Sequence, residues 1–156
     1  MAKVSQRQIV ASVTPSASQP NTKTAVPDFA LGSRKYFSQV SGGETQAQVE
    51  KVYDGGSSTP EVLPAPISVG DVTVTRHYDP EIDGPLVSNA RPLVGKARYD
   101  ISVFTLDADN QPLAGRTRVY PRALLTSITE PDGDSSSGGP ANFSMTFSCE
   151  NVVGTA

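Results

Sequence analysis

Few residues of this chain have the types and the spacing that chemistry at a site requires. His77 is the only histidine and Cys149 the only cysteine among the 156 residues. A His–His metal pair and an intrachain disulfide are therefore excluded, and no Cys–His pair lies close in sequence. His77 falls at the end of a predicted strand, where we expect a surface or interface residue. Cys149 falls at an inward-facing position of the last predicted strand, where we expect a buried structural thiol.

Carboxylates gather at turns. The 107–110 segment, Asp-x-Asp-Asn, resembles the opening of a calcium loop, but the glycine and closing glutamate of that loop are absent, so a hairpin turn is expected. Asp132 and Asp134 lie in a Gly/Ser loop with nothing apolar nearby to raise a pKa. Glu81 and Asp83 are expected to interact with a helix dipole. We therefore predict a protein that is not an enzyme and that binds no metal or cofactor.

Composition fits one soluble domain with many turns. The chain has 13 Gly and 13 Pro, 37% hydrophobic residues and a net charge of −3. A negative net charge argues against nucleic-acid binding, which needs a basic face. The N-terminus lacks the apolar run of a signal peptide, and no run approaches the length of a membrane span. We expect a soluble protein made in a cytoplasm, with no membrane partner.

The elements that would position any site are mostly short strands. Residues 70–76 alternate between two faces, as do residues 97–106 and 142–151. One short helix is predicted to begin near Pro80, with its length limited by later prolines. This pattern predicts a mainly β fold: a small β-sandwich or barrel of two packed antiparallel sheets with one short flanking helix.

Two long segments do not fit an isolated domain. Residues 1–32 are predicted to form an extended N-terminal arm, with one short strand over 8–13, and residues 33–156 to form the β domain. The strands on either side of Ser41-Gly-Gly43 are predicted to pair around that turn. Residues 54–69 read as a long loop without periodicity. Arms, long loops and open sheet edges are features that assemblies use to reach neighbouring copies.

The order of these elements resembles the tail tube proteins of bacteriophages and related contractile injection machines. The matching pieces, in chain order, are Phe37–Gly42, a strand ending in Asp54-Gly-Gly56, the strand Gly70–Arg76, a helix from Pro80, Tyr99–Asp107, Arg122–Ile128 and Phe143–Cys149. The resemblance implies two sheets packed roughly crosswise, hexameric rings stacked into a hollow tube, and DNA that passes through without specific binding.

The resemblance also implies partners and a place. The subunit would assemble in the host cytoplasm and lie in the tail of a virion. Its first partner would be further copies of itself, followed by tail sheath, baseplate or initiator, terminator and tape-measure proteins. The loop over 54–69 would contact the next ring, with the candidate residues Asp54, Gly55, Gly56, Pro60, Pro64 and Pro66. The arm before Tyr36 would reach a neighbour.

Neutral and acidic side chains suit a channel that must not hold DNA. Candidates for the lumen are therefore polar faces of the predicted strands, with an ordinary solvated sheet face as the alternative. The first set is Glu44, Gln46, Gln48 and Glu50, and the second set is Ser144, Thr146 and Ser148. A different reading of the whole chain is a monomeric β-sandwich binding or capsid-decoration module, which would gather exposed aromatic residues at loop tips.

Overall fold

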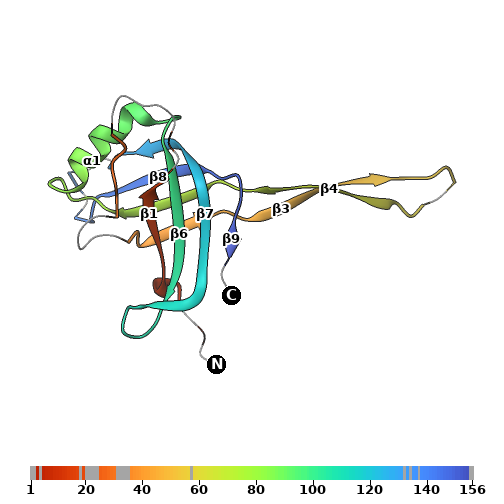
Figure 1. Cartoon of the computed structure of the whole chain (residues 1–156), viewed down its shortest axis with the longest axis horizontal. Helices are drawn as coiled ribbons and strands as arrows, with labels where there is room; N and C mark the ends of the chain where they lie inside the picture. The colour runs from red at the N-terminus through yellow and green to blue at the C-terminus, as the bar shows by residue number, and fades with distance from the viewer. Residues whose placement is uncertain are drawn as a thin grey trace.

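Antiparallel strands make up most of the chain in the computed structural model (Figure 1). The structure describes residues 3, 5–17, 19, 25–30, 36–56, 58–131, 133, 135–136 and 138–154, without the side chains of residues 7, 114 and 116. In chain order the elements are the 3-10 helix η1 (Gln6–Gln8), β1 (Ile9–Pro15), β2 (Gln39–Gly42), β3 (Thr45–Val52), β4 (Glu61–Val69), β5 (Val72–His77), α1 (Asp83–Ala90), the 3-10 helix η3 (Arg91–Leu93), β6 (Arg98–Leu106), β7 (Pro112–Thr129), β8 (Asn142–Ser148) and β9 (Val153–Gly154).

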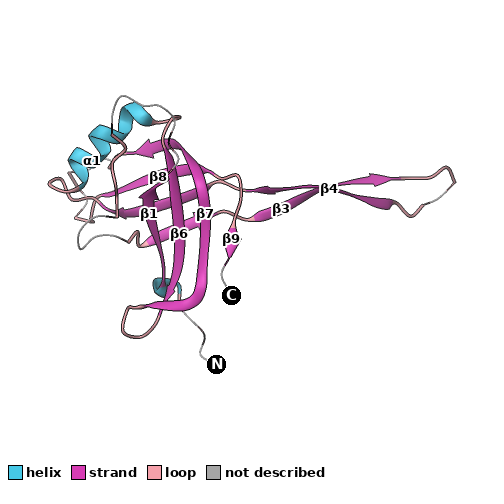
Figure 2. Ribbon diagram, in the orientation of Figure 1, coloured by secondary structure: helices cyan, strands magenta, loops and turns pink. Residues whose placement is uncertain are grey.

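The main sheet has the order β1-β6-β7-β8-β5-β2, with β9 paired to β7. The sheet curls so that its two ends meet. Ala11 of β1 and Phe37, just before β2, exchange two backbone hydrogen bonds of 3.1 and 2.7 Å. Strands β3 and β4 form a separate two-stranded sheet, which projects from the body as a long hairpin (Figure 2). The predicted mainly β fold with antiparallel sheets and one short flanking helix is confirmed.

Alternating side chains fill the inside of the curled sheet. Val72, Val74, Phe143, Met145 and Phe147 are all buried, as the alternation of their strands predicts. Strands β5 and β8 pair so that Val74 lies opposite Met145. Helix α1 covers one end of this core (Figure 1). None of the helices in the described part of the chain has the length and apolar character needed to cross a membrane.

A buried ion pair lies at the helix end of the core. Arg76, at the end of β5, donates hydrogen bonds to the Asp83 carboxylate and, at 3.0 Å, to the Phe29 carbonyl. Its guanidinium carbon lies 4.6 Å from the centre of the Phe37 ring. Asp83 also accepts a hydrogen bond of 2.9 Å from the Asp79 backbone N–H. This pair therefore ties β5, α1 and the segment that carries Phe29 around one aromatic cluster.

The N-terminal segment differs from the predicted arm where the structure describes it. The expected short strand is present as β1, but it pairs along its whole length with β6. Further on, Phe29 is buried in the core, and the Tyr99 hydroxyl donates a hydrogen bond of 2.9 Å to the Pro27 carbonyl. Backbone hydrogen bonds to β6 and burial of an aromatic ring hold these parts within their own chain. Residues 21–24 and 31–35 lie outside the described residues.

Two other expectations are wrong. Strands β2 and β3 do not pair around Gly42-Gly43, because β2 pairs with β5 and β3 with β4. Residues 61–69, predicted as the second half of a loop, form strand β4. Its prolines are tolerated because β4 has a partner on one side only, so its other edge needs no N–H donors. The helix begins at Asp83, three residues after Pro80.

Candidate assembly interface

The residues that could do chemistry lie apart. The His77 Nδ1 is 2.6 Å from the Asn142 Oδ1 across a strand pair. The Asp107 carboxylate accepts hydrogen bonds from the backbone N–H groups of Asp109 and Gln111, which makes 107–111 a turn, as predicted. Across the described residues no three His, Cys, Asp or Glu side chains come together as a metal site would require. Asp132 and Asp134 lie outside those residues.

Burial raises the pKa of two groups in the body. The Cys149 thiol is half-buried just beyond β8, and its pKa is raised to about 11, mainly by burial and further by the Asp71 carboxylate. Burial also raises the pKa of the Tyr99 hydroxyl, and the Asp28 carboxylate adds to this shift. Both groups stay protonated and neutral at physiological pH, so they serve packing. The expected buried position of Cys149 is met in part, since the residue lies one position beyond the end of β8 and is half-buried.

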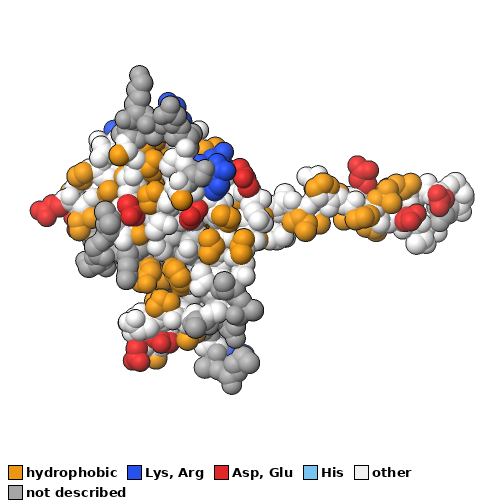
Figure 3. All heavy atoms as spheres, viewed as in Figure 1, with side chains coloured by type: hydrophobic (Ala, Val, Ile, Leu, Met, Phe, Trp, Pro, Cys, Tyr) orange, Lys and Arg blue, Asp and Glu red, His pale blue; other side chains and the backbone are white. Residues whose placement is uncertain are grey.

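The projecting hairpin is the feature that an isolated domain does not need. Every residue of β3 is exposed, and so are most residues of β4. Six of the nine large hydrophobic side chains that are exposed among the described residues lie between residues 49 and 67. Figure 3 shows apolar side chains along the hairpin, with acidic side chains toward its far end. Monomeric proteins rarely leave so much apolar surface in water, so the hairpin is a candidate interface.

Register divides the hairpin into an apolar face and a mainly polar face, which also carries Leu63 and Val52 toward the tip. Residues paired directly across an antiparallel ladder point to the same side, and successive residues alternate. The apolar face consists of the pairs Ala47–Ile67, Val49–Pro64 and Lys51–Val62, beginning at Thr45–Val69. Ile67 is 70% exposed, Val62 55% and Val49 54%. Lys51 is the only charged residue on this face. The face therefore resembles the inward side of a core strand whose packing partner is missing.

The first set of lumen candidates lies on the polar face. Glu44 and Gln46 contact each other through a hydrogen bond of 3.3 Å, and Gln48 and Glu50 follow at the same period. All four side chains are exposed. The alternation predicted for these residues from sequence is therefore present.

The second set lies on the outward side of the main sheet. Ser144 and Thr146 of β8 stand opposite Thr75 and Thr73 of β5, and the hydroxyls of Thr73 and Thr146 are 3.2 Å apart. The same rows continue on either side of β5 and β8 with uncharged polar residues: Gln39, Ser41, Ser127 and Thr129. Ser148 is exposed at the end of the strand. This part of the sheet therefore presents hydroxyl and amide groups without a charge.

The apolar face of the hairpin begins next to the body, because Val69, at the base of that face, packs against the core. The polar face with Glu44 is the opposite side of the hairpin. The two sets of lumen candidates, about 100 positions apart in sequence, therefore lie on two polar faces, one on the hairpin and one on the main sheet.

A glycine joint connects the hairpin to the body. Gly42 and Gly43 have φ of +83° and +74°, and a Cβ on Gly43 would lie 2.4 Å from the Tyr120 hydroxyl oxygen. That hydroxyl donates a hydrogen bond of 3.1 Å to the Gly43 carbonyl. The partner strand bends alongside, with the Gly70 N–H bonded to the Glu44 carbonyl at 2.8 Å. The direction of the hairpin is therefore set by close backbone packing.

The residues predicted to contact a next ring fall in two places. Asp54, Gly55, Gly56 and Pro60 form the hairpin tip, whereas Pro64 and Pro66 lie within β4. Tyr53 precedes the tip and is 61% exposed. Exposed aromatic residues at several loop tips, which the alternative binding module requires, are not gathered in the described residues. Tyr36, Tyr78, Tyr99 and Tyr120 are all buried or half-buried.

Comparison with solved structures places this geometry in a known context. A chain of the PVC sheath-tube complex, an extracellular contractile injection system in the extended state, has a TM-score of 0.71 at 18% identity, covering 99% of this chain and 92% of that one. The chain has the fold of a contractile injection system component. A chain of the PVC sheath/tube terminator gives 0.72 at 19% identity, covering 100% and 99%.

A further match comes from the anti-feeding prophage. A chain of its tube-terminating cap superposes with a TM-score of 0.70 at 18% identity, covering 100% of this chain and 93% of that one. Searches with protein-family models and against curated proteins give no match. The resemblance predicted from the order of strands is therefore confirmed at the level of the fold.

Proposed function

We propose that this chain is the subunit of a tail tube, in which hexameric rings stack around a central channel. The observation that carries the proposal is the amphipathic hairpin, whose apolar face is exposed in the single chain and needs a cover. The match to contractile injection system chains over nearly the whole length, in complexes that contain a tube, supports the same role. The role is structural, without a catalytic step.

Further copies of the chain are the cover for the apolar face. The face has the width of two strands and includes Val49, Val62 and Ile67, each more than half exposed. Such a strip fits beside the sheet of another copy, where its outer edges can also pair with a neighbouring strand. Rings and stacks follow when every copy both donates a hairpin and receives one, because such a contact is head-to-tail.

The two polar faces together are the proposed wall of the channel. One is an uncharged sheet face of hydroxyl and amide groups, and the other is the hairpin face that bears Glu44 and Glu50. A wall without basic groups makes no salt-dependent contacts with phosphates. DNA would therefore slide past it, and genome ejection from a virion tail is the proposed use. Sheath, baseplate, terminator and tape-measure proteins are the proposed partners beyond the chain itself.

Electron microscopy of the purified full chain tests this function. We expect negatively stained samples at rising protein concentration, or after addition of a preformed tail fragment as seed, to contain rings or hollow filaments. Sedimentation velocity on the same samples should show the loss of the monomer peak. Small uniform particles that stay monomeric in the presence of seed would favour the binding or capsid-decoration module instead.

A further inference from the structure

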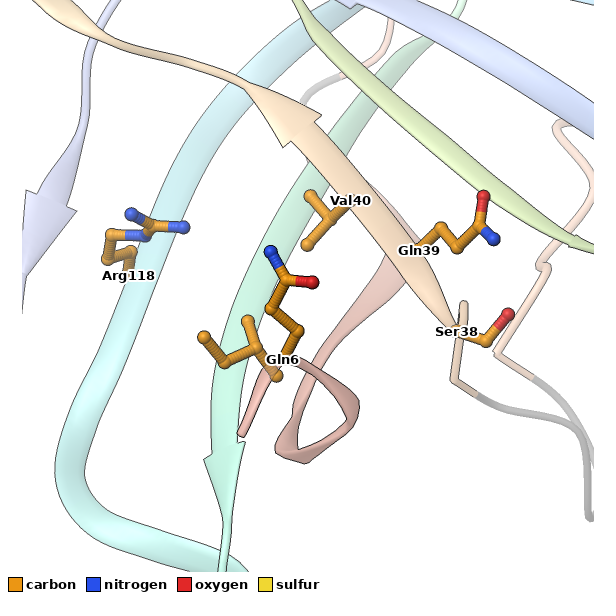
Figure 4. Close-up of a pocket in the computed structure, with 6 residues that line it drawn as sticks. Gln6, Ser38, Gln39, Val40 and Arg118 are labelled. Atoms are coloured by element: carbon orange, nitrogen blue, oxygen red, sulfur yellow. The ribbon is translucent and has the colours of Figure 1, made fainter. Parts of the chain in front are cut away.

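A pocket of about 390 Å³ opens where the two ends of the curled sheet approach each other. Its lining comes from η1, β1, β7, β2 and the residue before β2: Gln6, Ile9, Ser38, Gln39, Val40 and Arg118. Figure 4 shows Arg118, carried by β7, facing Val40 of β2 and Gln6 across the pocket. Ile9 and Val40 pack against the core on their inner sides. The pocket therefore has an apolar wall and one cationic group.

Arg118 stands on the core-facing side of its strand. Its register partner on β6 is Val103, which is buried, and Tyr120, two positions on, is buried as well. In the part of the chain that the structure describes, no carboxylate forms an ion pair with Arg118, whereas Arg76, Arg91 and Arg98 each have one. An arginine on an inward-facing position of an open pocket can receive a carboxylate from outside.

The hairpin tip has the complementary chemistry. Tyr53 is 61% exposed and is followed by Asp54, and Glu61 begins the returning strand β4. Eight residues of β3 carry this tip roughly 25 Å from the glycine joint. Figure 1 shows the hairpin pointing away from the body, so the tip does not reach the pocket of its own chain.

We propose that the pocket receives the hairpin tip of a second copy, with the Tyr53 ring against Ile9 and Val40 and the Asp54 carboxylate on the Arg118 guanidinium. The pocket volume accommodates one tyrosine side chain, and Tyr and Arg are the residue types that most often dominate interface energy. This inference rests on the proposed self-assembly and names the receiving site for it. The contact is heterologous, so each copy uses its tip and its pocket with different neighbours.

Charge reversal tests the pairing. Arg118→Glu and Asp54→Arg should each raise the protein concentration at half-assembly by about tenfold or more, and the double variant should restore it to within about threefold of the original chain. Lys96→Glu is the matched control, since it makes the same charge change as Arg118→Glu outside the pocket, and it should assemble as the original chain does. Assembly of both single variants at the original concentration, or no recovery in the double variant, would overturn the proposal.

Cross-linking tests the location. In a Cys149→Ser background, Tyr53→Cys combined with Gln6→Cys should give disulfide-linked ladders of copies under mild oxidation of assembled material. Ile82→Cys in place of Tyr53→Cys is the control and should give none. Absent ladders with intact tubes would refute the receiving site and leave the proposed function standing. If the original chain does not assemble even when seeded, the proposed function fails, and this inference fails with it.

Discussion

Arg76 and Asp83 form an ion pair that is almost fully removed from solvent, with side-chain exposures of 4% and 0%. The pair joins the end of strand β5 to the first turn of helix α1, and the guanidinium also lies over the Phe37 ring. Two charges are stable in such a place only when each satisfies the other and the remaining donors and acceptors find partners. The Phe29 carbonyl and the Asp79 N–H supply two of those partners.

Removal of one member of this pair should therefore destabilise the chain strongly. We expect Asp83→Ala to lower the free energy of unfolding by about 3–5 kcal/mol, because it leaves a buried guanidinium without its counter-ion. The Arg91–Glu130 pair is the control, since both side chains are about half exposed or more. Glu130→Ala should cost at most about 1 kcal/mol in urea denaturation followed by circular dichroism. Equal losses in the two variants would contradict a special role for the buried pair.

The glycine joint should tolerate no side chain. Gly43→Ala would place a Cβ against the Tyr120 hydroxyl at a positive φ, and we expect a loss of about 1–3 kcal/mol in unfolding free energy. Gly55→Ala at the hairpin tip is the control, because a Cβ there meets nothing within 4 Å. Thermal unfolding of the two variants side by side checks this. A Gly43→Ala chain as stable as the control would show that the joint can move.

The apolar face should matter for assembly and not for the stability of the monomer. Ile67→Ser changes a side chain that is 70% exposed, so the unfolding free energy should stay within about 0.5 kcal/mol. The fraction of protein in tubes should fall sharply, since the apolar atoms of the Ile67 side chain would be buried between copies. Gln46→Ser on the polar face is the matched control and should assemble normally. Normal tubes from Ile67→Ser would remove the apolar face from the interface.

The charge of the proposed channel wall should control passage. Changing both Glu44 and Glu50 to Lys is expected to leave tubes intact and to slow genome ejection, because lysines in the wall would hold phosphates. Ejection rates of particles that carry the variant, measured at several salt concentrations, test this, and the delay should shrink as salt rises. Fully assembled tubes with the original ejection rate would contradict the assignment of this face to the lumen.

The Cys149 thiol should react slowly in the native chain. Its pKa of about 11 leaves little thiolate at pH 8, so alkylation by iodoacetamide should be slower than in the urea-unfolded chain and should accelerate as pH approaches 11. The raised pKa also contributes stability that is fully present below the ordinary thiol pKa and is lost as pH rises through about 11. A Cys149→Ala variant should lose less stability across that alkaline range. Equal alkylation rates for folded and unfolded chains would refute the shift.

Much of the fold can be predicted from the local alternation of apolar and polar residues. The periods of two in β5, β6 and β8 identify these strands and their buried faces, because one inward residue in two is a local consequence of an extended backbone. The same logic places Glu44, Gln46, Gln48 and Glu50 on one polar face. The order of these elements was also sufficient to indicate the tube-like fold.

Tertiary structure decided the rest. Strand β4 contains Pro64 and Pro66, and only its unpaired edge makes them acceptable, so local rules indicated a loop. The Gly42-Gly43 pair is typical of a hairpin turn in sequence. In the structure it links β2 to β3 without reversing the chain, because the other strand bends alongside it at Gly70 and pairs with it. The Arg76–Asp83 pair and the pocket around Arg118 depend on distances between segments that the chain brings together only when the sheet curls. Alternation fixes which way a side chain points, whereas its partner across the core or in another copy is a property of the folded whole.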